Sequence, residues 1–415
     1  MQMLTISEAA QVLDLSVDTL RRWDKGGLIR STRSAQNHRL FDLDEIRRVH
    51  AKREARHTSE PNFKVYKDEQ TEFTVIDLFA GGGGTALGLD NAGFKHVLLN
   101  EFDAKACETL RSNRKDWNVV EGDVAEIGFS EYNGKVDLVE GGFPCQAFSY
   151  AGRGKGFADT RGTLFYQWAR AVREVMPKIA IAENVRGLVA HDEGRTLEAM
   201  VKEIKSIKDD KGRTYRLAMK VLKAQYFDVS QKRERLFMVL VRSDIETEIL
   251  FPKERDYIVS LWESIGDCPP SDGARYADWK FEIMDKVPEG GYWRDLDLET
   301  QKQYLKGSFH LTGGKTGMAR RLSWAEPSLT LTCNPAQKQT ERCHPEETRP
   351  LNVREYARIQ TFPDDWEFSG GMSAAYKQIG NAVPVNLAYH LGRAVKAMLD
   401  PTNYLDDSFE VAEEI

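Results

Sequence analysis

The sequence predicts an α/β fold built on a parallel sheet with helices on both faces. Between Thr74 and about Val241, short apolar runs alternate with amphipathic stretches of helical period, which is the pattern of a doubly wound sheet. The clearest apolar runs are TVIDLF, HVLLNE, VDLVEGG and IAIAENV. A glycine-rich turn follows the first run, and in this fold class functional groups gather beyond the carboxyl ends of the strands.

Length and composition favour a globular protein of two or three domains. The chain has 415 residues, of which 41% are apolar and 29% charged, and these values are ordinary for globular proteins. No run of about 18 apolar residues is present, so we expect no membrane span. Glu8, Asp14 and Asp18 lie where a signal peptide needs an uncharged apolar core, so we expect a cytoplasmic protein. The net charge of −6 does not by itself indicate a nucleic-acid-binding protein.

The cysteines favour a free thiol over a metal site or a disulfide framework. No two of them have CxxC spacing, so we expect no zinc and no other metal. A disulfide framework is not expected in a chain this long with so few cysteines. The five are Cys107, Cys145, Cys268, Cys333 and Cys343.

Residues 1–50 predict a small helix-turn-helix module. Ser7 can cap a helix through EAAQVL, and Ser16 or Asp18 can cap a second helix, TLRRWDKG. Arg21 and Arg22 on the second helix then lie where a recognition helix meets DNA. The cationic side chains would supply affinity for phosphates that does not depend on sequence.

A wing and a third helix, capped by Asp42, are expected in RSTRSAQNHRLFDLDEIRRV. The whole pattern over residues 3–50 resembles the MerR and excisionase type of winged helix. A helical protein–protein module that never contacts DNA is the alternative. Residues 51–72 are polar and contain a proline, which predicts a linker.

The glycine-rich turn in VIDLFAGGGGTALGLDNAG indicates a nucleotide-type cofactor, because glycines there let the backbone approach a ligand. Its spacing is not that of a P-loop. Glu101 ends the next strand, where a carboxylate can bind ribose hydroxyls, and Phe102 can stack on an adenine. Asp123 can accept a hydrogen bond from an adenine amino group. These residues alone leave a nicotinamide cofactor and S-adenosylmethionine open.

Two candidate reactive groups follow later strands. Cys145 comes after the strand VDLVEG, in the segment GGFPCQAFSYAGRGKGF. A lone cysteine is usually a small buried apolar residue, but the neighbouring Gly, Pro and Gln favour an exposed turn, where a thiolate can act as a nucleophile. Glu183 closes the strand IAIAENV, so it can share a crevice with Cys145. A helix-capping role together with Asn184 is the alternative for Glu183.

The segment QKRER, residues 231–235, precedes the strand LFMVLV. Arg233 and Arg235 are two residues apart, so in an extended segment they face the same side. An ordinary solvated charge run before a strand is the alternative interpretation of this segment.

The order of these motifs resembles the DNA (cytosine-5)-methyltransferase family. Along the chain it is DLFAGGGG, NEFD, GD, GFPCQAFS, ENV, QKRER and YKQIGNAVP. The resemblance covers about residues 73–398. It implies a Rossmann-like S-adenosylmethionine-dependent methyltransferase domain with a small target-recognition domain, which here follows the winged helix-turn-helix. In this resemblance, Gly82 and Val385 occupy places where many relatives have a larger residue and a second proline, respectively.

The resemblance also implies a covalent mechanism. Cys145 would add to C6 of cytosine, which makes C5 nucleophilic. Glu183 would hydrogen-bond or protonate N3, and Asn184 would orient Glu183. Arg233 and Arg235 would contact the base O2 and the backbone near the thiolate, and stabilise developing negative charge. The target base must leave the duplex, because C6 of a stacked base is out of reach.

The implied methyl donor is S-adenosyl-L-methionine. The resemblance places its methionine and ribose side near the glycine-rich turn, its adenine near the second and third strands, and its sulfonium near the Pro-Cys motif, with the late GNAVP motif closing the pocket. The implied cofactor-binding residues are Phe79, Gly81, Gly83, Glu101, Phe102, Asp123, Pro144 and Asn381.

The implied partner is duplex DNA, read at a short site. The loop after Cys145 is rich in glycine and cations, as in the family's mobile catalytic loop, and the segment GSFHLTGGKTGMARRLSW mixes small, basic and hydroxyl residues suited to the major groove. The candidate DNA contacts, besides Arg21 and Arg22, are Ser149, Arg153, Lys155, Arg161, Gln231, Thr312, Lys315, Thr316, Arg320 and Arg321.

These motifs divide the chain into six parts: a helix-turn-helix domain (1–50), a linker (51–72), a catalytic domain (73–244), a target-recognition region (245–320), a C-terminal part that completes the catalytic domain (321–398) and a disordered acidic tail (399–415). We expect a monomer, protecting host DNA beside a cognate restriction endonuclease, with autoregulation by the helix-turn-helix. A solitary methyltransferase without a nuclease fits the residues equally well. The alternatives are a transcription regulator that senses S-adenosylmethionine and a cytosine-5 methyltransferase acting on RNA. Intact Cys145 and Glu183 argue against the first, and a distinct recognition region argues against the second.

Overall fold

The computed structural model describes residues 3–13, 15, 17–25, 29, 31–34, 39–43, 46, 60–144, 164–310, 315–400, 402 and 407–415. The chain divides into two compact units, residues 1–62 and 63–415, each of which is described by itself. None of the helices in the described part is long and apolar enough to cross a membrane.

The first unit has the predicted pair of helices and the predicted wing. Its elements are β1 (Met3–Thr5), α1 (Ile6–Val12), α2 (Val17–Lys25), β2 (Ser31–Arg33) and β3 (Arg39–Asp42). β3 pairs antiparallel with both β1 and β2. Leu20, Trp23 and Phe41 are buried in the core of the unit. The expected third helix begins at the edge of the described residues and lies mostly outside them.

Thr5, and not Ser7, caps helix α1. The Thr5 hydroxyl accepts a hydrogen bond from the Glu8 amide, and the Glu8 carboxylate accepts one from the Thr5 amide. The prediction of Ser7 as cap was wrong because Thr5 and Glu8 form a reciprocal capping box two residues earlier, which satisfies more of the free amides at the helix start.

The second unit is built on a seven-stranded sheet with the order β6-β5-β4-β7-β8-β11-β9. Its strands are β4 (Thr74–Leu78), β5 (Lys95–Glu101), β6 (Val119–Glu121), β7 (Leu138–Gly141), β8 (Ile179–Val185), β9 (Tyr215–Lys223) and β11 (Glu234–Arg242). The neighbouring strands β6, β5, β4, β7 and β8 run parallel to one another, as predicted. β11 runs antiparallel to both of its neighbours, so the expectation of a purely parallel sheet was wrong at this edge.

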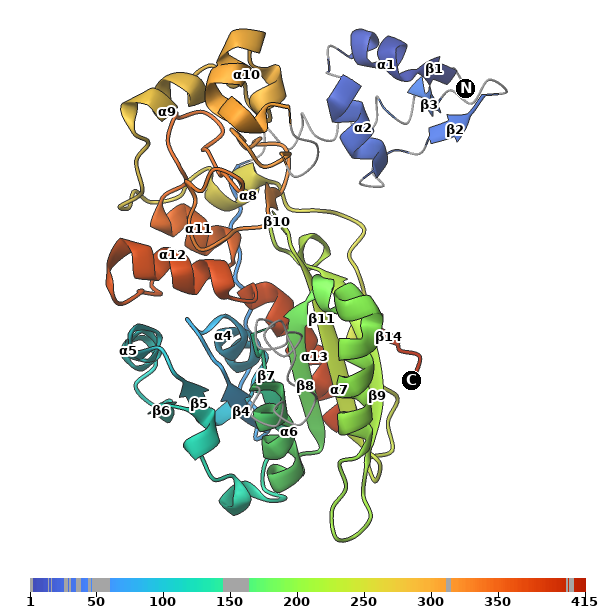
Figure 1. The fold of residues 1–415 in the computed structure, drawn as a ribbon. Helices are drawn as coiled ribbons and strands as arrows, with labels where there is room; N and C mark the ends of the chain where they lie inside the picture. The colour runs from blue at the N-terminus through green and yellow to red at the C-terminus, as the bar shows by residue number, and fades with distance from the viewer. Residues whose placement is uncertain are drawn as a thin grey trace. The chain divides into compact units, whose positions relative to one another are not determined.

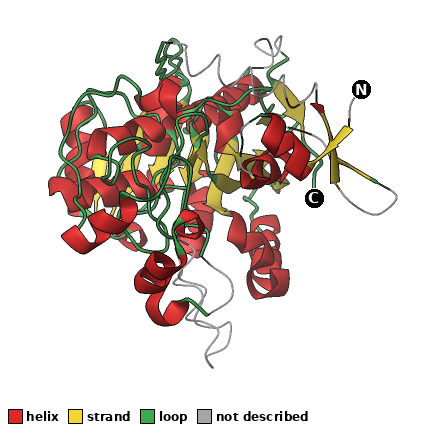
Figure 2. Ribbon diagram, turned by 90° about the horizontal axis from the view of Figure 1, so that it is seen from above, coloured by secondary structure: helices red, strands yellow, loops and turns green. Residues whose placement is uncertain are grey.

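Helices cover both faces of the sheet (Figures 1 and 2). Alternate strand residues such as Val75, Leu138 and Ile179 pack on one side with α4 (Gly84–Asn91) and α13 (Val385–Leu399). The intervening residues, such as Ile76 and Val139, pack on the other side with α6 (Leu164–Val175) and α7 (Arg195–Lys205). A strand that is buried on both faces is apolar over most of its length, which is why the four runs stand out in the sequence.

The remaining elements lie at the edges of the sheet and in a smaller lobe. Short turns of 3-10 helix are η1 (Val124–Glu126), η2 (Ser130–Tyr132), η5 (Arg186–Gly194), η6 (Ala224–Tyr226), η7 (Trp293–Asp295) and η8 (Lys306–Ser308). The other helices are α5 (Ala104–Asn113), α8 (Leu261–Ile265), α9 (Asp278–Met284), α10 (Leu298–Leu305), α11 (Val353–Ile359) and α12 (Gly371–Asn381). Two short strand pairs are β10 (Gln231–Lys232) with β13 (Ser328–Leu329), and β12 (Leu250–Pro252) with β14 (Phe409–Val411).

The smaller lobe has its own core but not the predicted boundaries. Residues between Ile283 and Ala319 form this core together with Cys343. Ile249 and Leu261 pack instead into the cores of the larger lobe. The first part of the expected region 245–320 therefore belongs to the catalytic lobe. Cys343, which comes after this region, belongs to the small lobe.

Residues 63–72 of the predicted linker and the strand β14 of the predicted tail belong to the folded second unit. Tyr66 stacks on Tyr389 with ring centroids 5.6 Å apart, and Asp68 forms an ion pair with Lys396. Residues 63–73 thus belong to the folded second unit. In the acidic tail, β14 pairs with β12. Both predictions were wrong for these residues, because the Tyr66 ring, the Asp68 carboxylate and the β14 backbone have partners far away in sequence.

Candidate active site

The carboxyl ends of four parallel strands bring the predicted site residues to one edge of the sheet. The turn at 79–83 follows β4, Glu101 ends β5, the segment 142–144 follows β7 and Glu183 lies near the end of β8. Cys145, Ser149, Arg153, Lys155 and Arg161 lie outside the described residues.

Glu183 is buried and held by Arg235. The guanidinium Nε of Arg235 lies 2.7 Å from Oε1 of Glu183. Antiparallel pairing places Phe237 of β11 opposite Glu183, which leaves Arg235, two residues earlier, on the same face of the sheet. Burial raises the pKa of the Glu183 carboxyl, and the charges of Arg235 and Arg233 oppose that rise. A carboxyl with a raised pKa in a cleft is a candidate for proton transfer.

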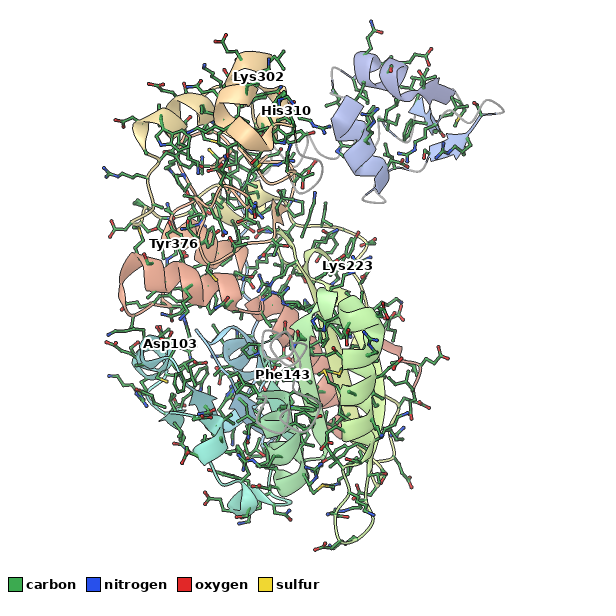
Figure 3. The ribbon with its side chains drawn as sticks, viewed as in Figure 1. Asp103, Phe143, Lys223, Lys302, His310 and Tyr376 are labelled. Carbon is green, nitrogen blue, oxygen red and sulfur yellow. The ribbon has the colours of Figure 1, made fainter. Side chains whose placement is uncertain are left out.

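The segment that leads to Cys145 runs directly beside Glu183. A Cβ atom on Gly142 would lie 3.1 Å from Glu183 Oε2, so glycine allows this close approach. The side-chain amide of Asn184 donates a hydrogen bond of 3.0 Å to the Phe143 carbonyl, and Phe143 is labelled beside β7 and β8 in Figure 3. Asn184 was expected to orient Glu183. It instead fixes the backbone of the loop that carries Pro144.

Arg233 has a structural role that the sequence did not indicate. It is 2% exposed, and its guanidinium donates to the backbone carbonyls of Leu331, Gly380 and Asn381. Burial lowers its pKa to about 9. The expectation that Arg233 and Arg235 act alike is corrected, because Arg233 ties the start of β11 to the GNAVP segment.

The glycine-rich turn has the backbone shape of a ligand cradle. Phe79 has a φ of 62°, Gly81 of 54° and Gly83 of 92°, and this left-handed region favours glycine. At Gly83 a Cβ would lie 2.8 Å from Leu110 and from Trp366, so a larger side chain has no room there. A bent backbone of this kind exposes amide groups to a ligand.

Glu101 and Phe102 lie beside this turn. The Glu101 carboxylate accepts hydrogen bonds from the amides of Gly81, Phe102 and Asp103, at 2.7 to 2.8 Å. Phe102 is 77% exposed, which leaves its ring available for stacking. Asp103 caps α5 and forms an ion pair with Lys377 of α12, and Figure 3 shows Asp103 next to that helix.

Three further predicted cofactor residues lie around the same edge. Asp123 caps η1 by accepting a hydrogen bond from the Ala125 amide. Pro144 is exposed at the last described position before Cys145. Asn381 is exposed at the end of α12, and its side-chain oxygen lies 3.1 Å from the Cys333 sulfur.

Two predicted DNA contacts are buried. Gln231 is fully buried, where its amide bonds the Gln360 side chain and its oxygen accepts from the Leu331 amide. Arg321 is 4% exposed, and its guanidinium donates to carbonyls of the small lobe and to the Thr348 hydroxyl. Both expectations of a DNA contact are corrected, because the polar groups of these side chains are buried and hydrogen-bonded within the protein.

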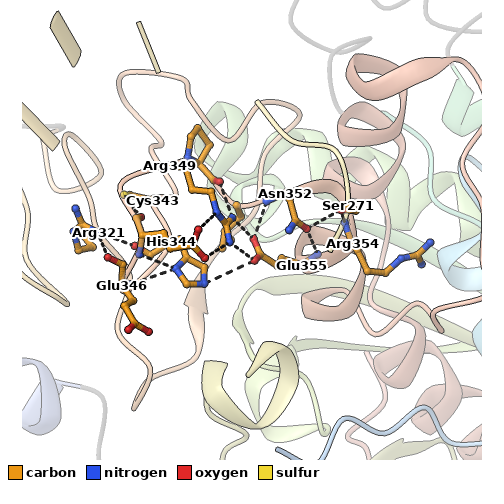
Figure 4. Close-up of polar contacts among 12 residues, drawn as sticks. Ser271, Arg321, Cys343, His344, Glu346, Arg349, Asn352, Arg354 and Glu355 are labelled. Carbon is orange, nitrogen blue, oxygen red and sulfur yellow. Dashed lines mark hydrogen bonds and ion pairs between the residues drawn. The ribbon is translucent and has the colours of Figure 1, made fainter. Parts of the chain in front are cut away.

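Figure 4 shows the network around Arg321 and its link to α11. Arg321 donates to the carbonyls of His344 and Glu346. Arg349 then makes a two-point contact with Glu355, with both nitrogen–oxygen distances 2.8 Å. Fork-to-fork contacts of this type fix geometry as well as charge, so the small lobe is attached to the helix that follows it.

The other predicted DNA contacts differ in exposure. Thr316 is exposed, and Lys315 and Arg320 are half-buried. Arg320 lies 4.6 Å above the ring of Tyr292 and donates to the Thr316 carbonyl. Arg21 is exposed on α2. The side chain of Arg22 and all of Thr312 lie outside the described part of the chain.

Asp77 of β4 and Glu140 of β7 are buried acidic residues that the sequence reasoning missed, at 1% and 2% exposure. An acidic residue inside an otherwise apolar strand was the available signal for both. No group of three or more His, Cys, Asp or Glu side chains in the described part could hold a metal ion.

Comparison with known proteins matches this arrangement to a family. The model of the C-5 cytosine-specific DNA methylase family matches residues 73–397, and that of the MerR family regulatory protein matches residues 5–41. Type II methyltransferase M.Eco47II of Escherichia coli is 54% identical, with 96% of each chain covered. Type II methyltransferase M.PspPI of Psychrobacter sp. is 55% identical over 79% of this chain and 80% of its own.

The solved structures agree on the fold. A mutant of Spodoptera frugiperda DNMT2 has a TM-score of 0.56 at 15% identity, covering 78% of this chain and 100% of that one. With the family model spanning most of the chain, the protein belongs to the C-5 cytosine-specific DNA methylase family and is a DNA (cytosine-5)-methyltransferase with a MerR-like module at its N-terminus.

Proposed function

We propose that the protein transfers a methyl group from S-adenosyl-L-methionine to C5 of a cytosine in duplex DNA, with Cys145 as nucleophile and Glu183 as the group that acts on N3. The observation that carries this proposal is the position of the Glu183 carboxyl. It lies against Gly142, three residues before Cys145, and is held there by Arg235. The carboxyl, whose pKa is raised by burial, therefore lies beside the segment that leads to Cys145.

Cys145 and Glu183 act on different atoms of the base. The Cys145 sulfur forms a bond to C6, and Glu183 gives a proton or hydrogen bond to N3, so that the electron pair moves to C5. Arg235 keeps the Glu183 carboxyl in place. After C5 has received the methyl group, its proton passes to water, the sulfur–C6 bond breaks and N3 returns any proton it received to Glu183, which restores the aromatic ring and the free thiolate.

The fit of S-adenosyl-L-methionine is supported by the turn after β4 and the end of β5. When bound, this cofactor supplies an electrophilic methyl group on sulfonium sulfur. The exposed Phe102 ring offers a stacking surface for its adenine, and Glu101 would hold the ribose. The turn at 79–83, Asp123, Pro144 and Asn381 would form the rest of the pocket. Glu101 would then exchange some of its present backbone hydrogen bonds for ribose hydroxyls.

The test is methyl transfer from labelled S-adenosyl-L-methionine to duplex DNA, with tRNA in parallel. We expect the wild type to label cytosine C5 in duplex DNA, Cys145→Ser to label nothing and Glu183→Gln to be slowed by about a hundredfold. Cys268→Ser is the matched control, because burial raises the pKa of that thiol to about 12 and it lies outside the site. Labelling of tRNA alone, or full activity of Cys145→Ser, would contradict the proposal.

We also infer that the protein protects host DNA within a restriction-modification system, acting as a cytoplasmic monomer beside a cognate endonuclease. The support is that M.Eco47II and M.PspPI are named Type II methyltransferases. The MerR-like match supports autoregulation by the first unit. Resistance of methylated plasmid DNA to a panel of Type II endonucleases would identify the site, and binding of residues 1–62 to the upstream DNA would test autoregulation.

A further inference from the structure

Asp77 and Glu140 face each other across neighbouring strands. In the parallel pairing of β4 and β7, these two residues are directly opposite, so both side chains lie on the same face of the sheet. Both are almost fully buried. Both Asp77 oxygens and Glu140 Oε1 lack a hydrogen-bond donor within the described residues. Two buried carboxylates at directly opposite positions, without donors, cannot both stay ionised.

Glu183 lies on the same face, close to this pair. Glu140 is opposite Ile181 of β8, and Glu183 is two residues further along that strand. The strand period of two therefore places Glu140 and Glu183 on one side of the sheet, one step apart along neighbouring strands. The three carboxyl groups form a row from β4 through β7 to β8 at the edge where the site lies.

The charges around the pair favour the protonated form. Burial raises the pKa of Asp77 to about 8, and the charge of Glu101 on β5 acts in the same direction. Burial raises the pKa of Glu140 well above its ordinary value, and the charges of Asp77 and Glu183 add to this. The cations of this site, Arg235 and Arg233, act on Glu183 from the β11 side.

We propose that Asp77 and Glu140 form a proton-sharing carboxyl pair that acts as a positioning pair for Glu183, because negative charge on the pair favours the protonated form of Glu183. The coupling is reciprocal. A negative Glu183 disfavours ionisation of Glu140, so a negative pair equally disfavours ionisation of Glu183. The role of Glu183 in this inference rests on the proposed function, but the coupling itself does not.

The first test uses the full chain and needs no activity. A buried carboxyl with a raised pKa stabilises the fold below its unfolded-state pKa, and that stability is lost as pH rises through the folded-state pKa. Glu140→Gln removes one such group at nearly constant shape. We expect its thermal midpoint, relative to the wild type, to rise by a few degrees between pH 6 and pH 9, and Asp77→Asn to behave in the same way. Glu121→Gln, at the exposed end of β6, is the control and should show a constant difference.

The second test measures the coupling to Glu183 by a double-mutant cycle. The midpoints of Glu140→Gln, Glu183→Gln and the double variant are compared at pH 6 and pH 9. We expect the shifts to depart further from additivity at pH 9, where more of the carboxyl groups carry charge, than at pH 6. A midpoint difference for Glu140→Gln that does not change with pH overturns the proton-sharing pair. Additive shifts at pH 9 overturn its coupling to Glu183.

The third readout links the pair to catalysis. In single-turnover methyl transfer, the alkaline limb of the rate for Glu140→Gln should move to lower pH by about one unit, with little change in the rate at pH 6. A variant limb that coincides with the wild-type limb overturns the positioning role. If the wild type transfers no methyl group, the proposed function fails, and the double-mutant cycle still decides whether the three carboxyls are coupled.

Discussion

At the residue scale, the site depends on one buried carboxyl that is compensated by one guanidinium. The Glu183 and Arg235 side chains are only 11% and 13% exposed. Removing one partner of a buried ion pair leaves the other charge without solvation, which costs far more than breaking a surface pair. Glu183 can reduce this cost by taking up a proton, so the consequence of losing Arg235 depends on pH.

Arg235→Ala should therefore destabilise the protein more at alkaline than at acidic pH. Without the cation, the pKa of Glu183 rises further above its unfolded-state value, and stability is lost as pH increases through it. We expect a loss of about 3 kcal/mol in the free energy of unfolding at pH 8 and a clearly smaller loss at pH 5. Urea unfolding at the two pH values measures this.

Arg111→Ala is the matched control for that experiment. Arg111 pairs with Glu121 at the surface, where both side chains are more than 40% exposed. Its loss should cost less than about 1 kcal/mol at either pH. Equal losses for Arg235→Ala at pH 5 and pH 8 would show that Glu183 does not take up a proton when its partner is removed.

The sequence could predict residues whose position follows from a local element, but not those whose partners are distant. Glu183 and Glu101 come at strand ends, and their place at one edge of the sheet followed from the parallel fold. The structural roles of Asn184 and Arg233 depend on carbonyls 41 and 147 residues away, such as those of Phe143 and Gly380. A charge pattern cannot show that a guanidinium donates its hydrogen bonds to backbone oxygens.

At the element scale, the turn after β7 must pass close to β8. A Cβ on Gly142 would lie 3.1 Å from Glu183 Oε2, a distance at which the carboxyl must move by a few tenths of an ångström. Gly142→Ala should slow methyl transfer by about tenfold, because a small misplacement of a catalytic group is costly, while changing the thermal midpoint little. Gly128→Ala is the control, since nothing lies within 4 Å of its Cβ and its φ is not positive.

Single-turnover rates and melting curves of both variants decide this prediction. A Gly142→Ala protein with the wild-type rate would mean that the Glu183 carboxyl tolerates the displacement. A large loss of stability with a normal rate would mean that the glycine serves the strand and not the site.

Strands with an apolar run were predictable from the sequence. Strands that form mainly by pairing with a distant strand were not. β9 contains Arg216, Lys220 and Lys223 within nine residues, and its charged side chains hide the strand period. β14 is three residues long and lies in an acidic tail. It forms because β12 offers an unpaired edge, which the sequence of the tail does not show.

The C-terminal strand should contribute measurably to stability. Phe409 packs on the core beside α13, whereas Val411, on the same strand, is 55% exposed. Phe409→Ala should lower the free energy of unfolding by about 2 kcal/mol, and Val411→Ala by less than about 0.5 kcal/mol. Urea unfolding of the two variants measures the difference, and equal effects would contradict the packing of β14 on the core.

At the scale of the whole molecule, the chain contains two units with separate cores. The first unit buries its own cluster around Leu20 and Phe41, and the second has its sheet and small lobe. The sequence predicted both units, since each has a pattern of its own. It misplaced the boundary, because residues 63–73 look polar but bind α13 through Tyr66 and Asp68.

The position of that boundary gives the last prediction. A chain of residues 63–415 should fold and transfer methyl groups at close to the wild-type rate, because it keeps every residue of the proposed site. A chain of residues 74–415 should melt several degrees lower, because it loses the stacking of Tyr66 on Tyr389 and the contacts of Asp68 with the Tyr389 hydroxyl and Lys396. Melting curves and single-turnover rates of the two chains measure this. If both melt alike, residues 63–73 are a linker after all, and if the longer chain is inactive, methyl transfer requires the MerR-like unit.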